Sequence, residues 1–275
     1  MPVRRKARRI LVIPDVHHHV GNAEYWLRTM SYDQVVFLGD YFDDFGDSPQ
    51  LTQSTAAWIR EHMLAQPDWV FLLGNHDLAY LADPDDRVIA PGFTLAKRQA
   101  MEGELPRGWL SRFRLGHWAA PDLLLSHAGL HPGWLRRQVH QEAASLIEQA
   151  EQDLARSQYH QLLSWGQDRG GLSSHQRVGG ILWMDWGSLI PLSFCHQIVG
   201  HTPGWTVRHK THGASVNLCL DVRNAEVAAM ISQESGESER LVRVYQRAES
   251  KPELMLEHSL PRLLKARPLF VMAGI

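Results

Sequence analysis

Cysteine is scarce in this chain of 275 residues, which contains only Cys195 and Cys219. Two thiols in apolar stretches of a chain this long do not make a disulfide framework, and we therefore expect a reducing compartment, the cytoplasm. The sequence also lacks a run of 18 apolar residues free of charge, which predicts no membrane-spanning helix. The apolar run behind the basic N-terminal residues stops at Pro14, so we expect no secretion signal.

An excess of charge of one sign is missing as well. The 28 Lys and Arg residues nearly balance the 30 Asp and Glu residues, and the formal net charge at pH 7 is −2. A chain without a general basic field does not attract nucleic acid or membrane surfaces unspecifically, so these partners are not favoured. The basic run at residues 4–9 is most simply a solvated tail, and a nucleic-acid end-processing enzyme stays open as an alternative.

The first part of the chain predicts strands joined by crossover helices. Strands are expected at residues 10–13, 35–38 and 69–73, and helices at residues 23–30 and 51–64. The strands are continuous apolar runs, which is typical of parallel strands buried on both faces. After an irregular stretch at residues 79–120, a fourth short strand is expected at residues 123–125.

The rest of the chain changes character. A mostly helical segment at residues 134–163 is followed by short, closely spaced strands at residues 196–199, 215–220, 226–231 and 241–246, which predict a second, largely antiparallel sheet. We therefore predict an α/β fold of two packed mixed β-sheets flanked by helices. Residues 1–247 are expected to form a single domain, with a helical insertion at residues 131–180, and residues 248–275 a C-terminal appendage.

Polar side chains follow five of the predicted strands at the point where each ends. The motifs are Asp15-Val16-His17, Gly39-Asp40-Tyr41-Phe42-Asp43, Gly74-Asn75-His76-Asp77, Ser126-His127-Ala128-Gly129 and Gly200-His201-Thr202-Pro203. Because the tips of neighbouring strands converge, these groups would crowd into a single pocket, which is costly unless cations neutralise it. Oxygen and imidazole donors without a thiolate suit manganese, iron, zinc or nickel.

The five motifs, in this order, resemble those of the calcineurin-like metallophosphoesterase superfamily. Residues 182–185 and 217–221 are also similar to segments of its serine/threonine protein phosphatase and diadenosine tetraphosphatase branch. The resemblance implies hydrolysis of a phosphoester by a hydroxide that bridges two divalent metal ions, manganese being the first expectation. Asp40 would bridge both metals, and the full set of implied ligands is Asp15, His17, Asp40, Asn75, His127 and His201.

The same resemblance implies the groups that act on the substrate. His76 would protonate the leaving-group oxygen, and Asp43 would orient His76. His18 and His131 are candidate substrate contacts: His18 stands where many relatives have Gly, so it could reach a phosphate or simply face solvent, and His131 lies just beyond the motif at residues 126–129.

Two departures from the branch bear on the substrate. Asp44 stands where the branch carries a phosphate-binding Arg, and residues 186–199 contain no Arg or Lys to supply the other. This loss weakens the case for a dianionic phosphomonoester. Pro203, where many nucleases and cyclic-nucleotide diesterases of the superfamily have a second His, points back toward the phosphatases and the dinucleoside polyphosphate hydrolases. Replacement arginines could come from elsewhere in the chain: Arg87, Arg98, Arg112, Arg169 or Arg177.

We therefore expect a phosphatase acting on a phosphomonoester, either a phosphoprotein or a nucleotide. A phosphodiesterase or a dinucleoside polyphosphate hydrolase is the alternative within the superfamily. A non-catalytic metal-binding scaffold is the alternative from another class.

Overall fold

The computed structural model describes residues 8–44, 46–82, 90, 92–170, 176–223, 226–233, 239–249 and 251–263. The strands are β1 (Arg8–Ile13), β2 (Gln34–Phe37), β3 (Val70–Phe71), β4 (Gly116–Ala120), β5 (Leu123–Ser126), β6 (His196–Val199), β7 (Arg208–His212), β8 (Ser215–Cys219), β9 (Val227–Gln233), β10 (Arg240–Gln246) and β11 (Glu253–Leu260). The α-helices are α1 (Val20–Thr29), α2 (Pro49–Ala65), α3 (Asn75–Leu81), α4 (Leu95–Glu102) and α5 (His140–Ala155). Short 3-10 helices are η1 (Arg107–Arg112), η2 (Pro132–Trp134), η3 (Gln161–Leu163) and η4 (Gln167–Arg169).

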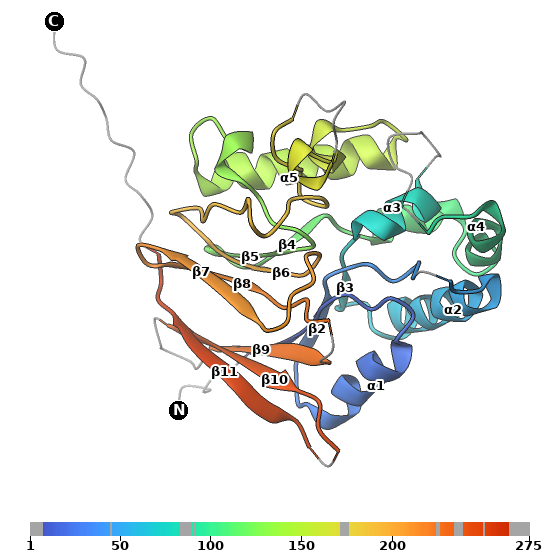
Figure 1. Cartoon of the computed structure of the whole chain (residues 1–275), viewed down its shortest axis with the longest axis horizontal. Helices are drawn as coiled ribbons and strands as arrows, with labels where there is room; N and C mark the ends of the chain where they lie inside the picture. Colours follow the sequence, from blue (N-terminus) through green and yellow to red (C-terminus); the bar gives the residue numbers. More distant parts are fainter. Residues whose placement is uncertain are drawn as a thin grey trace, which may run out of the picture.

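The strands form two mixed sheets, which stack with helices on their outer sides, as predicted (Figure 1). One sheet has the order β11-β10-β9-β1-β2-β3, in which β1, β2 and β3 run parallel and β9 to β11 antiparallel. The other has the order β4-β5-β6-β8-β7, with β5, β6 and β8 parallel and an antiparallel strand at each edge.

The prediction of a separate, largely antiparallel second sheet for the later strands is wrong. β9 and β10 belong to the first sheet, where β9 pairs antiparallel with β1 from Arg8 opposite Gln233 to Val12 opposite Ala229. β6 and β8 lie parallel to β5 in the other sheet. Spacing along the chain indicates that a strand forms, but the strand's partner depends on which sheet edge the packed core leaves open.

Residues 79–120, expected to be irregular, contain α4, η1 and β4. The Thr94 hydroxyl caps α4 by accepting a hydrogen bond from the Lys97 N–H at 3.3 Å. The buried face of this helix carries Lys97 and Arg98 beside Met101, so it has no apolar period that would predict a helix. After residue 247, Glu253–Leu260 form β11, which pairs with β10 at the edge of the first sheet.

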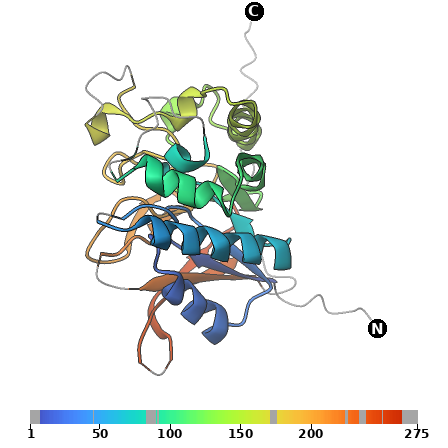
Figure 2. The same ribbon diagram turned by 90° about the vertical axis from the view of Figure 1, so that its right-hand side faces the viewer.

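Alternate residues of β1 enter two different hydrophobic cores. Leu11 and Ile13 pack with the buried faces of α1 and α2, whereas Ile10 and Val12 pack between the two sheets. Figure 2 shows α1 and α2 beside the first sheet, and α5 lies over the other sheet in Figure 1. Burial on both faces explains why residues 10–13 of β1 are all apolar rather than alternating with polar residues.

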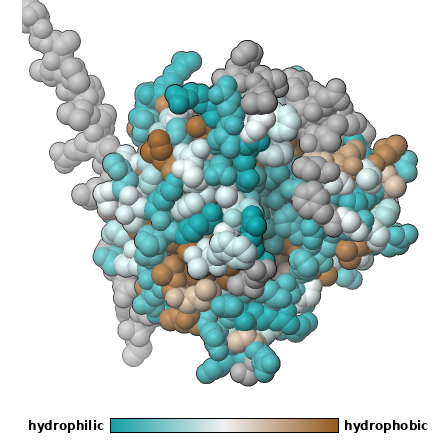
Figure 3. Space-filling model, viewed as in Figure 1, coloured by the Kyte–Doolittle hydropathy of each residue, from teal (hydrophilic) through white to brown (hydrophobic). Residues whose placement is uncertain are grey.

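The molecular face shown in Figure 3 is largely hydrophilic, with apolar residues in small scattered groups. Among the described residues, none of the helices combines the length and apolar character needed to cross a membrane.

Candidate active site

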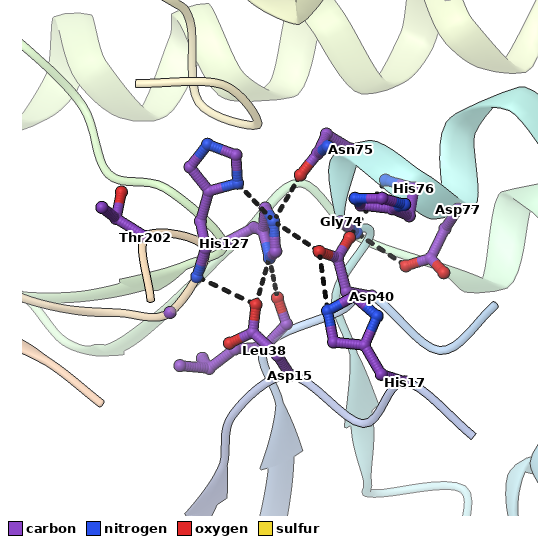
Figure 4. Close-up of polar contacts among 12 residues, drawn as sticks. Asp15, His17, Leu38, Asp40, Gly74, Asn75, His76, Asp77, His127 and Thr202 are labelled. Carbon is purple, nitrogen blue, oxygen red and sulfur yellow. Dashed lines mark hydrogen bonds and ion pairs between the residues drawn. The ribbon is translucent and has the colours of Figure 1, made fainter. Parts of the chain in front are cut away.

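The strand-end motifs of both sheets meet at one place. β1, β2 and β3 are parallel and deliver Asp15, Asp40 and Asn75 to the same edge of their sheet. β5 and β6 are parallel in the other sheet and deliver His127 and His201. Figure 4 shows Asp15, His17, Asp40, Asn75 and His127 converging from these separate elements. The structure thus brings together all six residues that the sequence analysis named as metal ligands.

One group of three ligand atoms comes from Asp15, His17 and Asp40, and these atoms lie within 4.8 Å of one another. His17 Nδ1 lies 2.8 Å from the carbonyl oxygen of Asp43. Since a carbonyl only accepts, Nδ1 carries the proton, and Nε2 presents its lone pair 3.6 Å from Asp40 Oδ2.

A second group comes from Asp40, His127 and His201, again within 4.8 Å, and Asn75 lies beside it. His127 Nδ1 donates to the carbonyl oxygen of Leu38 at 2.9 Å, so in the neutral ring Nε2 is an acceptor. That Nε2 lies 3.0 Å from Asn75 Oδ1 and 3.5 Å from Asp40 Oδ2. Acceptors that face one another in this way need a cation among them.

Unpartnered buried atoms support the fit of metal ions to these groups. Asp15 Oδ2 and His201 Nε2 are buried and have no hydrogen-bond partner, although each residue is otherwise well fixed. Asp15 Oδ1 accepts from the His201 N–H at 2.9 Å. Carboxylate, imidazole and amide donors together suit a borderline divalent metal rather than a soft one.

Electrostatics at the site reflect this crowding. Burial would raise the pKa of Asp40, but the surrounding imidazoles, led by His127, hold it well below its usual range. For Asp15 the effect of burial prevails, and its pKa is raised. Burial, together with the nearby His127, lowers the pKa of His201, which keeps the His201 ring neutral and able to donate a lone pair to a metal.

The backbone at the site is strained. Five residues without the freedom of glycine have positive φ angles there: His17, His18, Asp40, Asp43 and His201. The glycines of the motifs let the backbone pass close to the ligand side chains. A Cβ on Gly200, for example, would lie 2.0 Å from Asp15 Oδ2. Such conformations persist only where the surrounding structure enforces them, and they are typical of functional sites.

His76 lies beside the ligand groups without belonging to them. Its backbone N–H donates to Asp40 Oδ1 at 3.0 Å, and its Nδ1 lies 3.6 Å from Oδ2 of Asp43, which is fully buried. Burial lowers the pKa of His76, but Asp40 and then Asp43 outweigh it and raise the pKa to about 9. The imidazole is therefore protonated at neutral pH and able to donate a proton.

The sequence matches the family profile of calcineurin-like phosphoesterases over residues 8–183. The chain belongs to this family. Membership in the calcineurin-like phosphoesterase family supports metal-dependent hydrolysis of phosphoesters. A comparison with curated proteins finds no match.

Solved structures of similar fold include phosphatases of this architecture. The cold-active protein-tyrosine phosphatase of a psychrophilic Shewanella species is 13% identical with a TM-score of 0.50, and the alignment covers 92% of this chain and 80% of that one. A further structure of a cold-active protein tyrosine phosphatase gives 15% identity and a TM-score of 0.54 with the same coverage. Vps29 from Chaetomium thermophilum is 10% identical with a TM-score of 0.42, covering 94% of this chain and 100% of that one. At these identities the likeness concerns the fold alone.

The cleft above the ligand groups of this calcineurin-like phosphoesterase has a volume of about 410 Å³. Among the described residues that line it, the only Arg or Lys is Arg169. Arg169 Nη2 donates to the His201 carbonyl oxygen at 3.2 Å and to Thr202 Oγ1 at 3.4 Å, and Nε lies 3.5 Å from Asp185 Oδ2. Arg169 comes from η4, a segment in which the sequence showed no phosphate-binding motif.

The other arginines considered as replacements lie elsewhere or outside the described residues. Arg98 is buried and donates to a backbone carbonyl and to a carboxylate of its own helix α4. Arg112 packs over Trp109, and Arg177 is exposed and does not line the cleft. Arg87 lies outside the described residues.

The structure does not bring His18 and His131 into the cleft lining. His18 is buried, with Nδ1 2.9 Å from Thr55 Oγ1 and Nε2 2.5 Å from Asp47 Oδ2, so both nitrogens are engaged within the protein. His131 Nδ1 accepts from the Gly133 N–H at 2.9 Å and caps η2. Both rings thus have structural partners where the sequence analysis predicted substrate contacts.

Asp77, to which the sequence analysis assigned no role, joins two of the ligand loops. Its Oδ1 accepts from the N–H groups of Tyr41 and Phe42 at 2.7 and 3.1 Å, and its Oδ2 accepts from the Gly74 N–H at 2.8 Å. These bonds fix the loop after β2 against the start of α3. The position of an Asp in the first turn of α3 was the one signal that could have indicated a capping role.

Asp221 also lines the cleft, beyond the residues that the sequence analysis named. Burial, followed by the nearby Asp15 carboxylate, raises its pKa to about 8. A carboxyl group with its pKa raised this far is largely protonated at neutral pH, and a divalent cation in the cleft would favour its carboxylate form.

Proposed function

We propose that the protein hydrolyses a phosphomonoester, carried by a phosphoprotein or a nucleotide, with two divalent metal ions. One observation carries the proposal: two groups of ligand side chains share Asp40 and leave Asp15 Oδ2 and His201 Nε2 buried without a partner. Manganese is the first expectation, and iron, zinc and nickel accept the same donors. When bound, the ions would neutralise phosphoryl oxygens and lower the pKa of a water molecule that attacks phosphorus.

The residues around the ligands provide the remaining steps. His76 donates a proton from its imidazole to the leaving-group oxygen, which is otherwise a poor leaving group as an alkoxide. Asp43 orients the ring through the 3.6 Å approach to His76 Nδ1. Arg169 binds a phosphoryl oxygen, and its guanidinium in the cleft is what favours a dianionic monoester.

A phosphodiester or a dinucleoside polyphosphate is the second candidate substrate, and Asp44 favours it. Asp44 is exposed and lines the same cleft, where its carboxylate repels a dianion more strongly than a monoanion. The two candidates therefore differ in the charge that the cleft must hold.

The test is hydrolysis of 4-nitrophenyl phosphate and of bis(4-nitrophenyl) phosphate with added Mn²⁺. Faster cleavage of the monoester supports a phosphatase, and faster cleavage of the diester supports the second candidate. Cleavage of neither, by protein shown to hold metal, contradicts the hydrolase proposal and favours a metal-binding scaffold.

A further inference from the structure

Lys97 of α4 is a buried residue, only 5% exposed, and its side chain contacts Asp43 of the acid pair formed by His76 and Asp43. Its Nζ donates to Asp43 Oδ1 at 2.9 Å and to the carbonyl oxygen of Gly92 at 2.8 Å, and it forms an ion pair with Asp47. A buried ammonium group is stable only when acceptors surround it, and here three do.

The lysine is itself fixed from the opposite side. Asp47, its second carboxylate partner, lies with Oδ2 2.5 Å from His18 Nε2, and His18 Nδ1 lies 2.9 Å from Thr55 Oγ1 of α2. The Asp43 N–H also approaches His18 Nε2 at 3.0 Å. His18 thus ties the loop after β2 to α2, and the buried groups form a continuous series that ends at His76.

Asp43 is held so that its two oxygens have different roles. Oδ1 is bonded by Lys97, whereas Oδ2 has no hydrogen-bond partner and faces the equally unpartnered Nδ1 of His76. Gly92 packs against the carboxylate, since a Cβ there would lie 2.0 Å from Oδ1. Burial alone would lower the pKa of Lys97, but its hydrogen bonds to Asp47 and Asp43 raise it, so the ammonium keeps its charge.

We propose that Lys97 is a positioning residue for the leaving-group acid: it holds one oxygen of Asp43 so that the other stays directed at Nδ1 of His76. This inference rests on the proposed function, because it assumes that His76 donates a proton. Without Lys97 the Asp43 carboxylate loses its charged donor in a buried setting and turns toward the nearest remaining N–H groups. The imidazole then loses its orientation while the metal ligands keep theirs.

The test compares Lys97→Met with the wild type on two monoesters, phenyl phosphate with a poor leaving group and 4-nitrophenyl phosphate with a good one. Proton donation matters most for the poor leaving group, so we expect kcat on phenyl phosphate to fall about tenfold or more and kcat on 4-nitrophenyl phosphate to fall less than about threefold. KM and bound Mn²⁺ should stay as in the wild type. Lys97→Arg, which keeps the charge, should recover part of the phenyl phosphate activity.

A double-mutant cycle separates positioning from general destabilisation. If Lys97 acts through His76, adding Lys97→Met to His76→Asn lowers kcat on phenyl phosphate no further. Lys210→Met is the matched control, because Lys210 Nζ also has three acceptors, the carbonyl oxygens of Trp186, Gly187 and Leu189, but Lys210 does not line the cleft that His76 lines. This control should leave the ratio of the two kcat values unchanged.

Three results would overturn the inference: an equal loss on both esters, a multiplicative effect of the two substitutions, or the same shift of the ratio in Lys210→Met. If circular dichroism shows that Lys97→Met does not fold, Lys97→Gln replaces it, since Gln keeps a donor without the charge. Failure of the proposed function is distinguishable, because the wild type itself would then cleave neither ester.

Discussion

His201 lies against His127 with its Nδ1 3.1 Å from Nε2 of the other ring, although 74 residues separate the two in the chain. The His127 ring is fixed from behind by the Leu38 carbonyl, so its Nε2 points into the site as an acceptor. Two imidazoles in this arrangement, next to the Asp40 carboxylate, are candidate ligands for one side of a cation site.

Divalent metal should therefore stabilise the folded protein. We expect Mn²⁺ to raise the Tm of the chelator-treated wild type, since a ligand at 100 times its Kd adds about 2.7 kcal/mol to stability. Asp40→Ala removes the shared ligand and should abolish the Tm increase, metal binding in elemental analysis, and turnover. Asp68→Ala, at an exposed carboxylate, is the control and should behave as the wild type. Full activity in Asp40→Ala would contradict the assignment.

Replacing the acid should spare the metals. His76→Asn removes the ring that faces Asp43 but none of the grouped ligand atoms, so bound Mn²⁺ should equal that of the wild type. We expect kcat on an ester with a poor leaving group to fall by roughly 10²- to 10⁴-fold. Steady-state kinetics on phenyl phosphate measure this, and an unchanged kcat there would mean that another group donates the proton.

Arg169 should affect substrate binding more than proton transfer. Arg169→Met removes the cleft's guanidinium, and we expect kcat/KM for a monoester to fall by about 10- to 100-fold, corresponding to one lost charge-assisted hydrogen bond. Arg169→Lys should recover only part of the lost kcat/KM, because an ammonium group lacks the paired N–H donors with which a guanidinium binds two phosphoryl oxygens. Arg177→Met, at an exposed position outside the cleft lining, is the control. Equal kinetics of Arg169→Met and the wild type would remove Arg169 from the site.

Asp77 should contribute mainly to stability. Asp77→Ala leaves three buried N–H groups, those of Tyr41, Phe42 and Gly74, without their acceptor, and each costs about 1–3 kcal/mol. Equilibrium unfolding in urea should show a loss of at least about 3 kcal/mol for Asp77→Ala. Asp77→Asn keeps one acceptor oxygen and should lie between this variant and the wild type. A loss below about 1 kcal/mol in Asp77→Ala would show that the loop does not depend on these bonds.

His117 of β4 should make stability depend on pH. Burial, then the nearby Arg8 and Arg114, lower its pKa from 6.5 to about 4. Between these pH values the unfolded chain binds a proton at His117 and the folded protein does not, so stability falls as pH drops through the window. We expect His117→Gln to lose less stability than the wild type between pH 6.5 and pH 4 in urea unfolding, with His212→Gln, at an exposed histidine, as the control. Parallel pH profiles for all three proteins would show that His117 does not contribute.

The sequence by itself determined the strands that carry the site and the chemistry of their ends. Asp15, Asp40 and Asn75 follow continuous apolar runs directly, and parallel strands necessarily bring such ends to one edge of a sheet. These features are local, because the hydrophobic period and the residue after it lie within a few positions of each other. For that reason the convergence of Asp15, Asp40 and Asn75 was predictable from the sequence pattern, whereas the full set of six ligands was implied by the resemblance to the family.

Only the tertiary structure decided which distant side chains support those ends. Lys97 reaches Asp43 across 54 residues, and Arg169 reaches His201 across 32, from helices whose sequences contain no motif. The pairing of β9 with β1, which places the late strands β9 to β11 in the same sheet as β1, β2 and β3, is of the same kind. These two contacts and this strand pairing depend on which surfaces remain accessible once the rest of the chain has packed. Such surfaces are a property of the whole fold, and no single segment of the sequence specifies them.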